Sequence, residues 1–203
     1  MEIDVITAKK HLRDTRAPVH ELRVTSAPGV YALFLKDLSS LKPFEPGRDG
    51  LIYVGRSSDL AQRDLKIHFD SEKTGFSTLR RSLGAILKRC LNLSAVPRSS
   101  EPSESNVRCY RFVRDGEDSL TEWMRRNLEV SVFIVGNPRP LEADLISCIQ
   151  PLLNLKGWHN PYRQEIKALR KICADEARSH RSKRAALRSA RLRRGSLGLQ
   201  GGA

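Results

Sequence analysis

Short apolar runs along the chain predict strands, and stretches with apolar residues at helical spacing separate them. Residues 29–35 (GVYALFL) and 51–55 (LIYVG) are rich in β-branched and aromatic residues, and two prolines and two glycines lie in the loop between them. This arrangement predicts a hairpin with a long connection. The patterns at residues 107–113 and 129–136 predict two further strands.

Helical spacing appears in the segments between these runs. Five apolar side chains in residues 77–91 recur at i, i+4, i+7, i+8 and i+11, which predicts an amphipathic helix. Residues 119–128 open with a serine suited to an N-cap, and a helix is expected from Pro138 or Pro140 to just before Pro151. A helix is also expected after Gly55, with a cap chosen from Ser57, Ser58 and Asp59.

The C-terminal segment combines helix-forming composition with a strong positive charge. Residues 163–203 hold 12 Lys and Arg against three Asp and Glu, and so supply nine of the 13 net positive charges of the chain. Ile166, Leu169 and Ile172 fit one helical stripe, and the last residues read as a frayed end. A basic tail of this kind gives non-specific affinity for phosphates, and the alternative is a tail that only aids solubility.

Length and charge bound the class of protein. A chain of 203 residues fits one domain with extensions. The net charge of +13 and the pI of about 10.1 favour a polyanionic partner, with nucleic acid the first candidate and an anionic membrane surface the second.

The remaining composition gives expectations about the cell compartment. The four cysteines form no CxxC pair, so we expect neither a zinc site nor a disulfide framework. The N-terminus turns charged before any apolar stretch reaches signal-peptide length, and no run approaches a membrane span. We therefore expect a cytoplasmic protein, with nucleic acid rather than a membrane as its partner.

Glu142 is the most informative single carboxylate. On its expected helix it shares a face with Leu145, Ile146 and Ile149, where a charge is costly unless it is paired. One interpretation places it in the first helical turn, against the helix dipole and in reach of solvent. The other makes it a ligand of a hard cation such as Mg²⁺, which takes one or two carboxylates and meets substrate phosphates.

Tyr31, Tyr53, Arg63 and His68 each admit an ordinary and a functional interpretation. The tyrosines are either half-buried strand aromatics or phenols that reach a phosphate or a water, with Gly29 and Gly55 holding the backbone close to a ligand. Arg63 is either a solvated charge or stabilises a transition-state phosphate, and His68 is either a surface histidine or a general acid or base.

Taken together, these residues resemble a known family. The segments GVY at 29–31, YVG at 53–55 and LEADLISCIQPLLN at 141–154 follow the order and approximate spacing of the GIY-YIG nuclease motifs. Between and within them stand Ser57, Leu60, Arg63, His68, Glu142 and Asn154. The resemblance covers residues 28–155, and residues 70–137 form an insertion-like middle without a family motif.

The resemblance implies an α/β fold with a small, mostly antiparallel three- to four-stranded sheet flanked by helices, and cleavage of phosphodiesters with a divalent metal. Tyr31 would position or deprotonate the attacking water, Tyr53 would hydrogen-bond the scissile phosphate, and Arg63 would stabilise its developing charge. Glu142 would be the single protein ligand of Mg²⁺ or Mn²⁺, and Asn154 would support the site through hydrogen bonds.

His68 departs from the family pattern. Family members commonly place a histidine four residues after the arginine, whereas here it follows Arg63 by five. In a regular helix this separates the two side chains by roughly 140°. Either the helix ends or bulges between these residues, or His68 is not catalytic.

Phosphate contacts beside the site are expected from a set of basic and polar residues that comprises Arg56, Ser57, Arg80, Arg81 and Lys88. The arginines of the 77–91 helix can equally form its solvated back.

The leading hypothesis is a Mg²⁺-dependent endonuclease that cleaves DNA, with an N-terminal extension (1–27), a nuclease domain (28–160) and a basic helical or disordered tail (161–203). The sequence leaves open an RNA-cleaving nuclease and a non-catalytic nucleic-acid-binding or architectural protein. It identifies no oligomeric state.

Overall fold

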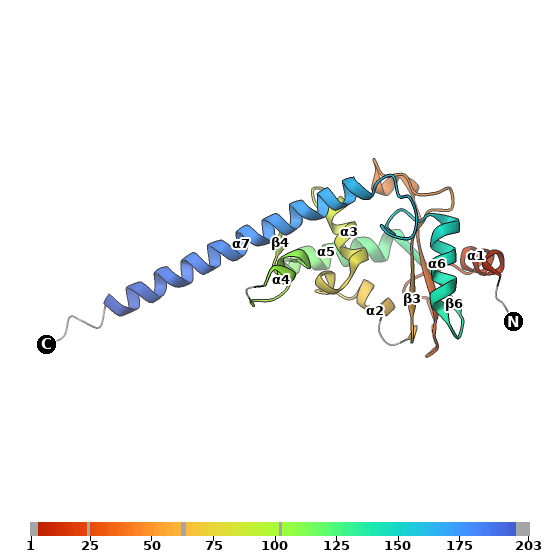
Figure 1. The fold of residues 1–203 in the computed structure, drawn as a ribbon, viewed down its shortest axis with the longest axis horizontal. Coiled ribbons are helices and arrows are strands. Elements are labelled where there is room, and N and C mark those ends of the chain that lie inside the picture. Colours follow the sequence, from red (N-terminus) through yellow and green to blue (C-terminus); the bar gives the residue numbers. More distant parts are fainter. Residues whose placement is uncertain (1–3, 24, 62–63, 102, 198–203) are drawn as a thin grey trace.

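The computed structural model describes residues 4–23, 25–61, 64–101 and 103–197, with residues 64–66 and 183–197 described as helical backbone only. A four-stranded sheet lies between two groups of helices (Figure 1). Its strands, in the spatial order β1-β6-β2-β3, are β1 (Ala17–Pro18), β6 (Leu128–Ile134), β2 (Gly29–Leu35) and β3 (Leu51–Ser57). Every neighbouring pair is antiparallel, which confirms the expected fold class.

The hairpin expected from the two early apolar runs is formed by β2 and β3. Its long connection contains a short 3₁₀ helix, η1 (Leu38–Leu41). On its other edge β2 pairs with β6, so Tyr31 lies between Gly55 of β3 and Val132 of β6. The middle segment of the chain, which carries no family motif, therefore supplies a central strand.

Strand β2 is apolar throughout because both faces of the sheet are covered. Its odd-numbered residues Tyr31, Leu33 and Leu35 join one core cluster, and its even-numbered residues Val30, Ala32 and Phe34 join the other. Alternation of side chains along a strand places the two sets on opposite faces. All seven residues of the strand are buried as a result.

Different helices cover the two faces. Helices α1 (Val5–Asp14) and α6 (Pro138–Ile149) supply buried residues to the core cluster on the even-numbered face of β2. The other cluster includes residues of the remaining helices, namely α2 (Asp64–Phe69), α3 (Thr78–Ile86), α4 (Glu104–Arg108), α5 (Arg114–Asn127) and α7 (Arg163–Leu197). A one-turn 3₁₀ helix, η2 (Thr74–Phe76), lies between α2 and α3.

Local signals explain where several helices begin and end. The Ser77 side chain accepts a hydrogen bond from the Arg80 N–H and caps α3. Helix α6 runs from Pro138 to Ile149, within the limits expected from the prolines, and its C-cap Gln150 adopts a left-handed conformation just before Pro151. Helix α5 begins five residues earlier than the expected start at Ser119, whose hydroxyl bonds to a backbone carbonyl within the helix.

The strand expected at residues 107–113 is wrong for most of its length. Ser103 caps α4, which extends through Arg108, and only Arg111–Phe112 forms a strand, β5. This strand pairs with β4 (Ala95–Val96) in a separate two-stranded sheet. The side chain of Ser103 accepts a hydrogen bond from the Asn106 N–H, and this cap favours a helix where a strand was expected.

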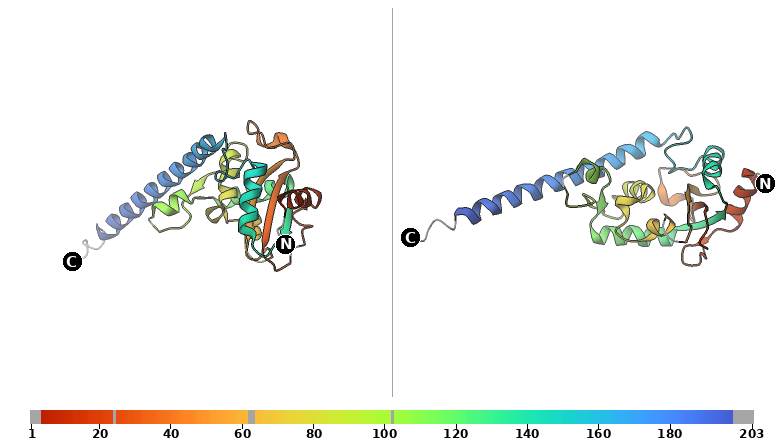
Figure 2. Two further views of the ribbon diagram at one scale, coloured as in Figure 1. Left: turned by 45° about the vertical axis from the view of Figure 1, so that its right-hand side comes forward. Right: turned by 60° about the horizontal axis from the view of Figure 1, so that its bottom comes forward.

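Both segments expected as extensions contribute to the core. Ala8 and Leu12 of α1 are buried, and β1 pairs with β6. The first half of α7 packs on α3, α4 and β4 and buries Ile166 and Cys173. The far part of α7 extends beyond the rest of the chain in all views (Figures 1 and 2). Among the described residues, no helix has the length and apolar character needed to cross a membrane.

Candidate active site

A cleft of about 650 Å³ opens where β3, α2, η2 and the start of α6 meet. Its lining contains six of the residues selected from the sequence, which are Tyr31, Tyr53, Arg56, Ser57, His68 and Glu142. Residues far apart in the chain therefore meet in one place.

Tyr31, Tyr53 and His68 form an aromatic cluster on one wall of the cleft. The ring centroids of Tyr31 and His68 are 5.5 Å apart, and those of Tyr53 and His68 are 5.9 Å apart. The Tyr31 hydroxyl lies 2.7 Å from Nε2 of His68. The tyrosine of the first strand is thus hydrogen-bonded to the histidine whose position departs from the family pattern.

Two residues at the start of α3, Ser77 and Arg80, form hydrogen bonds with the side chain and the backbone of His68. Its Nδ1 lies 2.8 Å from Oγ of Ser77, and its backbone carbonyl accepts a hydrogen bond of 3.0 Å from Nη1 of Arg80. Burial, with a smaller contribution from the Arg80 charge, lowers the pKa of His68 to about 4. The imidazole is therefore neutral at pH 7, with one ring nitrogen able to donate and the other able to accept.

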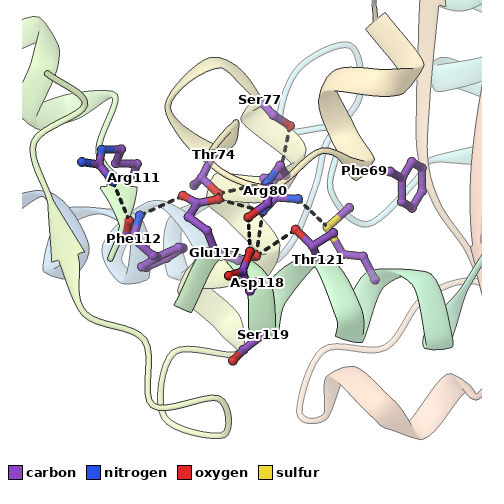
Figure 3. Close-up of polar contacts among 12 residues, drawn as sticks. Phe69, Thr74, Ser77, Arg80, Arg111, Phe112, Glu117, Asp118, Ser119 and Thr121 are labelled. Atoms are coloured by element: carbon purple, nitrogen blue, oxygen red, sulfur yellow. Dashed lines mark hydrogen bonds and ion pairs between the residues drawn. The ribbon is translucent and has the colours of Figure 1, made fainter. Parts of the chain in front are cut away.

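Arg80 forms a buried ion pair that joins several elements (Figure 3). Its Nη2 lies 2.7 Å from Oε2 of Glu117, and both side chains are fully buried. Thr74 donates to the same carboxylate oxygen, and the backbone N–H of Phe112 donates to the other. The expectation that Arg80 contacts a phosphate is wrong, because its guanidinium is buried and paired with Glu117.

Arg81 and Lys88 also lie outside the cleft. Arg81 is buried, and its Nη1 donates to the carbonyls of Thr74 and Gly75. Lys88 pairs with Glu176 of α7 at 2.7 Å. The expected phosphate contact by Arg81 is therefore also wrong, and Lys88, two residues after the end of α3, is engaged in an ion pair with α7. Arg56 is exposed and lines the cleft, whereas Ser57 lines it but is buried, with its hydroxyl bonded to the Asp59 backbone.

Glu142 enters the cleft from α6 and is paired with Arg56. Oε2 of Glu142 lies 2.7 Å from Nε of Arg56. Burial raises the pKa of the Glu142 carboxyl above its usual value, and Arg56 and Arg139 oppose this only in part. Because α6 begins at Pro138, Glu142 belongs to its second turn, so the helix dipole is not its main source of stabilisation.

The donor set of the cleft fits a metal ion held by one carboxylate. Glu142 is the single acidic residue in the described lining. A partly desolvated carboxylate with one arginine partner gains from a further cation, and Mg²⁺ characteristically binds one or two carboxylates and completes its shell with water and phosphate oxygens. Within the described part of the chain, no group of three or more His, Cys, Asp or Glu residues is arranged for a metal, which excludes an all-protein cage there.

Asn154 lies behind the cleft, against the outer edge of β3. Its side-chain oxygen accepts from the Val54 N–H and its side-chain nitrogen donates to the Val54 carbonyl, both at 2.8 Å. Leu153 adds a backbone bond to Ile52. The amide therefore takes the place of a neighbouring strand and fixes the segment that carries Tyr53, without itself lining the cleft.

The two glycines of the motifs make room for protein atoms. A Cβ at residue 55 would lie 2.4 Å from the Tyr31 hydroxyl oxygen, and one at residue 29 would lie 2.4 Å from the Phe133 carbonyl oxygen. Gly55 lines the cleft, as expected of a glycine that holds the backbone close to a ligand, whereas Gly29 does not line it. They permit close packing between strands and around the Tyr31 ring.

Arg63 lies outside the described residues, so its place relative to the cleft stays a prediction. Helix α2 is described only from Asp64, which leaves the five-residue spacing between Arg63 and His68 without a structural test.

Three residues of this region were missed by the sequence interpretation. Arg139 lines the cleft three residues before Glu142, a helical spacing that the sequence already displays. Phe76 and Ser77 come from the segment without a family motif, and no local signal links them to the cleft. The only visible sign was that Ser77 suits a helix cap.

Comparison with known proteins adds one match. A family model described as the GIY-YIG catalytic domain matches residues 29–172, from the first residue of β2 into α7. No curated protein and no solved structure was found to match the chain.

Proposed function

The chain belongs to the family of GIY-YIG catalytic domains, and on that premise we propose that it is a metal-dependent endonuclease that hydrolyses phosphodiester bonds of DNA. A nuclease of this type acts on nucleic acid, which agrees with the net charge of +13. The observation that carries the proposal is the convergence of the Tyr31–His68 pair and Glu142 on one cleft.

Tyr31 is the residue that positions the attacking water. With the Nδ1–H of His68 donated to Ser77, Nε2 accepts a hydrogen bond from the Tyr31 hydroxyl, and the Tyr31 oxygen offers its lone pairs to a water in the cleft. As the water oxygen bonds to phosphorus, its proton passes to Tyr31 and the phenol proton moves to Nε2. The bond from phosphorus to the leaving oxygen breaks, and that oxygen takes a proton from solvent.

Glu142 is the residue that holds the divalent ion, for which we propose Mg²⁺ or Mn²⁺. When bound, the ion supplies Lewis-acid stabilisation of the phosphate charge. Arg56 and Arg139, both exposed at the cleft, are placed to contact phosphate oxygens of the strand. Arg56 then exchanges its partner Glu142 for a phosphate.

The test compares cleavage by wild type and by Glu142→Gln. Both are incubated with supercoiled plasmid, linear duplex, single-stranded DNA and RNA, each with Mg²⁺ or with a chelator. Asp144→Asn is the matched control, because Asp144 lies on the same helix and is exposed outside the cleft. We expect cleavage of DNA by wild type and Asp144→Asn with Mg²⁺, and none by Glu142→Gln or with the chelator.

Each other outcome has a definite meaning. Cleavage that survives Glu142→Gln or the chelator rules out the single-carboxylate metal site. If only RNA is cleaved, the substrate is RNA and not DNA. Binding without cleavage of any substrate supports a non-catalytic nucleic-acid-binding protein.

A further inference from the structure

Phe76 is a large apolar side chain that remains 64% exposed at the cleft. It ends the 3₁₀ helix η2, next to the serine that holds His68. Scattered exposed apolar residues are ordinary on protein surfaces, but this one belongs to the lining of the candidate active site.

The turn that carries Phe76 is fixed by hydrogen bonds. Nη1 of Arg81 donates to the Gly75 carbonyl at 2.9 Å and to the Thr74 carbonyl at 3.3 Å. The N–H of Phe76 donates to the carbonyl of Lys73 at 2.9 Å, and the N–H of Ser77 donates to that of Thr74. The backbone under the exposed ring is therefore held in place in advance of any ligand.

Arg98 lies over the Phe76 ring. Its guanidinium carbon is 5.3 Å from the ring centroid, and its Nε donates to Oδ1 of Asn106 at 3.1 Å. A Cβ at residue 75 would lie 2.6 Å from Cγ of Arg98, so Gly75 lets the arginine cross the turn. The result is a ring and a guanidinium in cation–π contact, both anchored from a region remote in sequence from the motifs.

We propose that Phe76 and Arg98 form a stacking platform for an unpaired nucleobase of the strand whose backbone enters the cleft. This inference rests on the proposed nuclease function and adds a substrate class to it. Aromatic rings and guanidinium planes are the side-chain surfaces on which unstacked bases rest, whatever their identity. A base within a duplex has both faces covered by its neighbours, so a fixed aromatic face selects a base that is single-stranded, bulged or displaced.

The charge around the platform favours nucleic acid over an apolar protein segment. Arg98 places a cation on the ring itself, and Lys73 and Arg139 are exposed cations of the same turn and the same cleft. A purely apolar partner would have to desolvate these charges, whereas a nucleotide offers a ring for Phe76 and a phosphate for the arginines.

The experiment measures binding by the full chain in a chelator, so that no strand is cut. The probes are a 12-nucleotide oligothymidine, a strand of the same length made of abasic residues, and a 12-base-pair duplex. The variants are wild type, Phe76→Ala and Phe76→Trp. Ile172→Ala is the matched control, because Ile172 is a large apolar residue that is exposed outside the cleft.

We expect Phe76→Ala to bind oligothymidine about 5- to 150-fold more weakly than wild type, which is the usual effect of removing one stacking partner. Phe76→Trp restores the affinity, and Ile172→Ala leaves it unchanged. On the abasic strand, wild type and Phe76→Ala bind equally, because no base is present to stack.

Two results overturn the platform. An equal loss on the oligothymidine and abasic strands, or no loss on either, shows that no base stacks on Phe76. If Phe76→Ala loses more affinity for the duplex than for the single strand, Phe76 inserts between base pairs and does not stack on an unpaired base. The outcome is independent of cleavage, so failure of the Glu142→Gln test and failure of the platform are recognised separately.

Discussion

Tyr31 and Gly55 face each other across β2 and β3, and the phenol of Tyr31 fills the space that a side chain at residue 55 would occupy. A Cβ there would lie 2.4 Å from both the ring carbon Cζ and the hydroxyl oxygen. The glycine of the second motif is thus the partner of the tyrosine of the first. It allows the phenol to lie where it bonds to His68.

Gly55→Ala is expected to displace the Tyr31 ring and to reduce cleavage by at least about tenfold, since a misplaced catalytic group costs much of the rate. Overpacking costs about 1–3 kcal/mol of unfolding free energy. Cleavage rates and urea denaturation check both effects. Gly47→Ala is the control, because a Cβ at residue 47 meets no atom within 4 Å. Full activity of Gly55→Ala would contradict the role of the Tyr31 position.

Tyr31→Phe keeps the ring but removes the hydroxyl that bonds to His68. If Tyr31 handles the proton of the attacking water, the cleavage rate falls by about 10²- to 10⁴-fold, while affinity for nucleic acid measured in a chelator changes little. Tyr162→Phe is the control, because Tyr162 packs against Phe44 outside the cleft. A rate within about threefold of wild type would exclude Tyr31 from the proton transfer.

His68 gives a dependence of stability on pH whose sign follows from its lowered pKa of about 4. Its ordinary value is 6.5, so the unfolded chain takes up a proton between these values and the folded chain does not. The contribution of His68 is full above pH 6.5 and is lost as the pH falls towards 4. It amounts to about 3 kcal/mol of unfolding free energy.

His68→Asn should flatten this part of the curve. Urea denaturation at pH values from about 4 to 7 gives the slope of unfolding free energy, which should fall by up to about 1.4 kcal/mol per pH unit relative to wild type. His159→Asn is the control, because His159 is exposed. Parallel curves for wild type and His68→Asn would show that the folded imidazole titrates normally.

Arg80→Met leaves Glu117 buried without its charged partner. The expected loss is about 3–5 kcal/mol of unfolding free energy. Arg126→Met removes a surface pair with Glu122 and should cost less than about 1 kcal/mol. Chemical denaturation of both variants measures these losses of unfolding free energy. Losses of similar size would mean that the buried ion pair stabilises the protein no more than the surface pair does.

Deletion of residues 183–203 removes six Lys and Arg and no acidic residue. It leaves the buried part of α7, including Cys173 and Ala177, in place. We expect weaker binding of duplex DNA and a smaller dependence of log affinity on log salt, by about 0.9 for each phosphate that these residues neutralise in the full chain. An unchanged slope, measured by fluorescence anisotropy in a chelator, would exclude this segment from binding.

The sheet and its motif residues were predictable because their signals are local. The run from Gly29 to Leu35 is apolar at every position, and the tyrosine and glycine of each motif stand on strands that the pattern identifies. Pro138 and Pro151 marked the limits of α6 by rules of backbone geometry that hold in any fold.

The surroundings of His68 were not predictable from local patterns. The contacts of Ser77 and Arg80 with His68 depend on how α3 packs beside α2, and the charge of Arg80 is tolerated in the core only because Glu117, 37 residues later, lies against it. A basic residue on an amphipathic helix is usually solvated. The helical pattern therefore predicted an exposed Arg80, whereas its side chain is buried.

The dispersal of the site along the chain has a consequence for synthesis. Tyr31 is translated before Glu117, which holds the Arg80 side chain that supports His68, and Glu142 follows later still. Even then α7 has yet to cover α3. A nascent chain therefore lacks an assembled cleft until translation has passed Glu142 and the part of α7 that packs on α3.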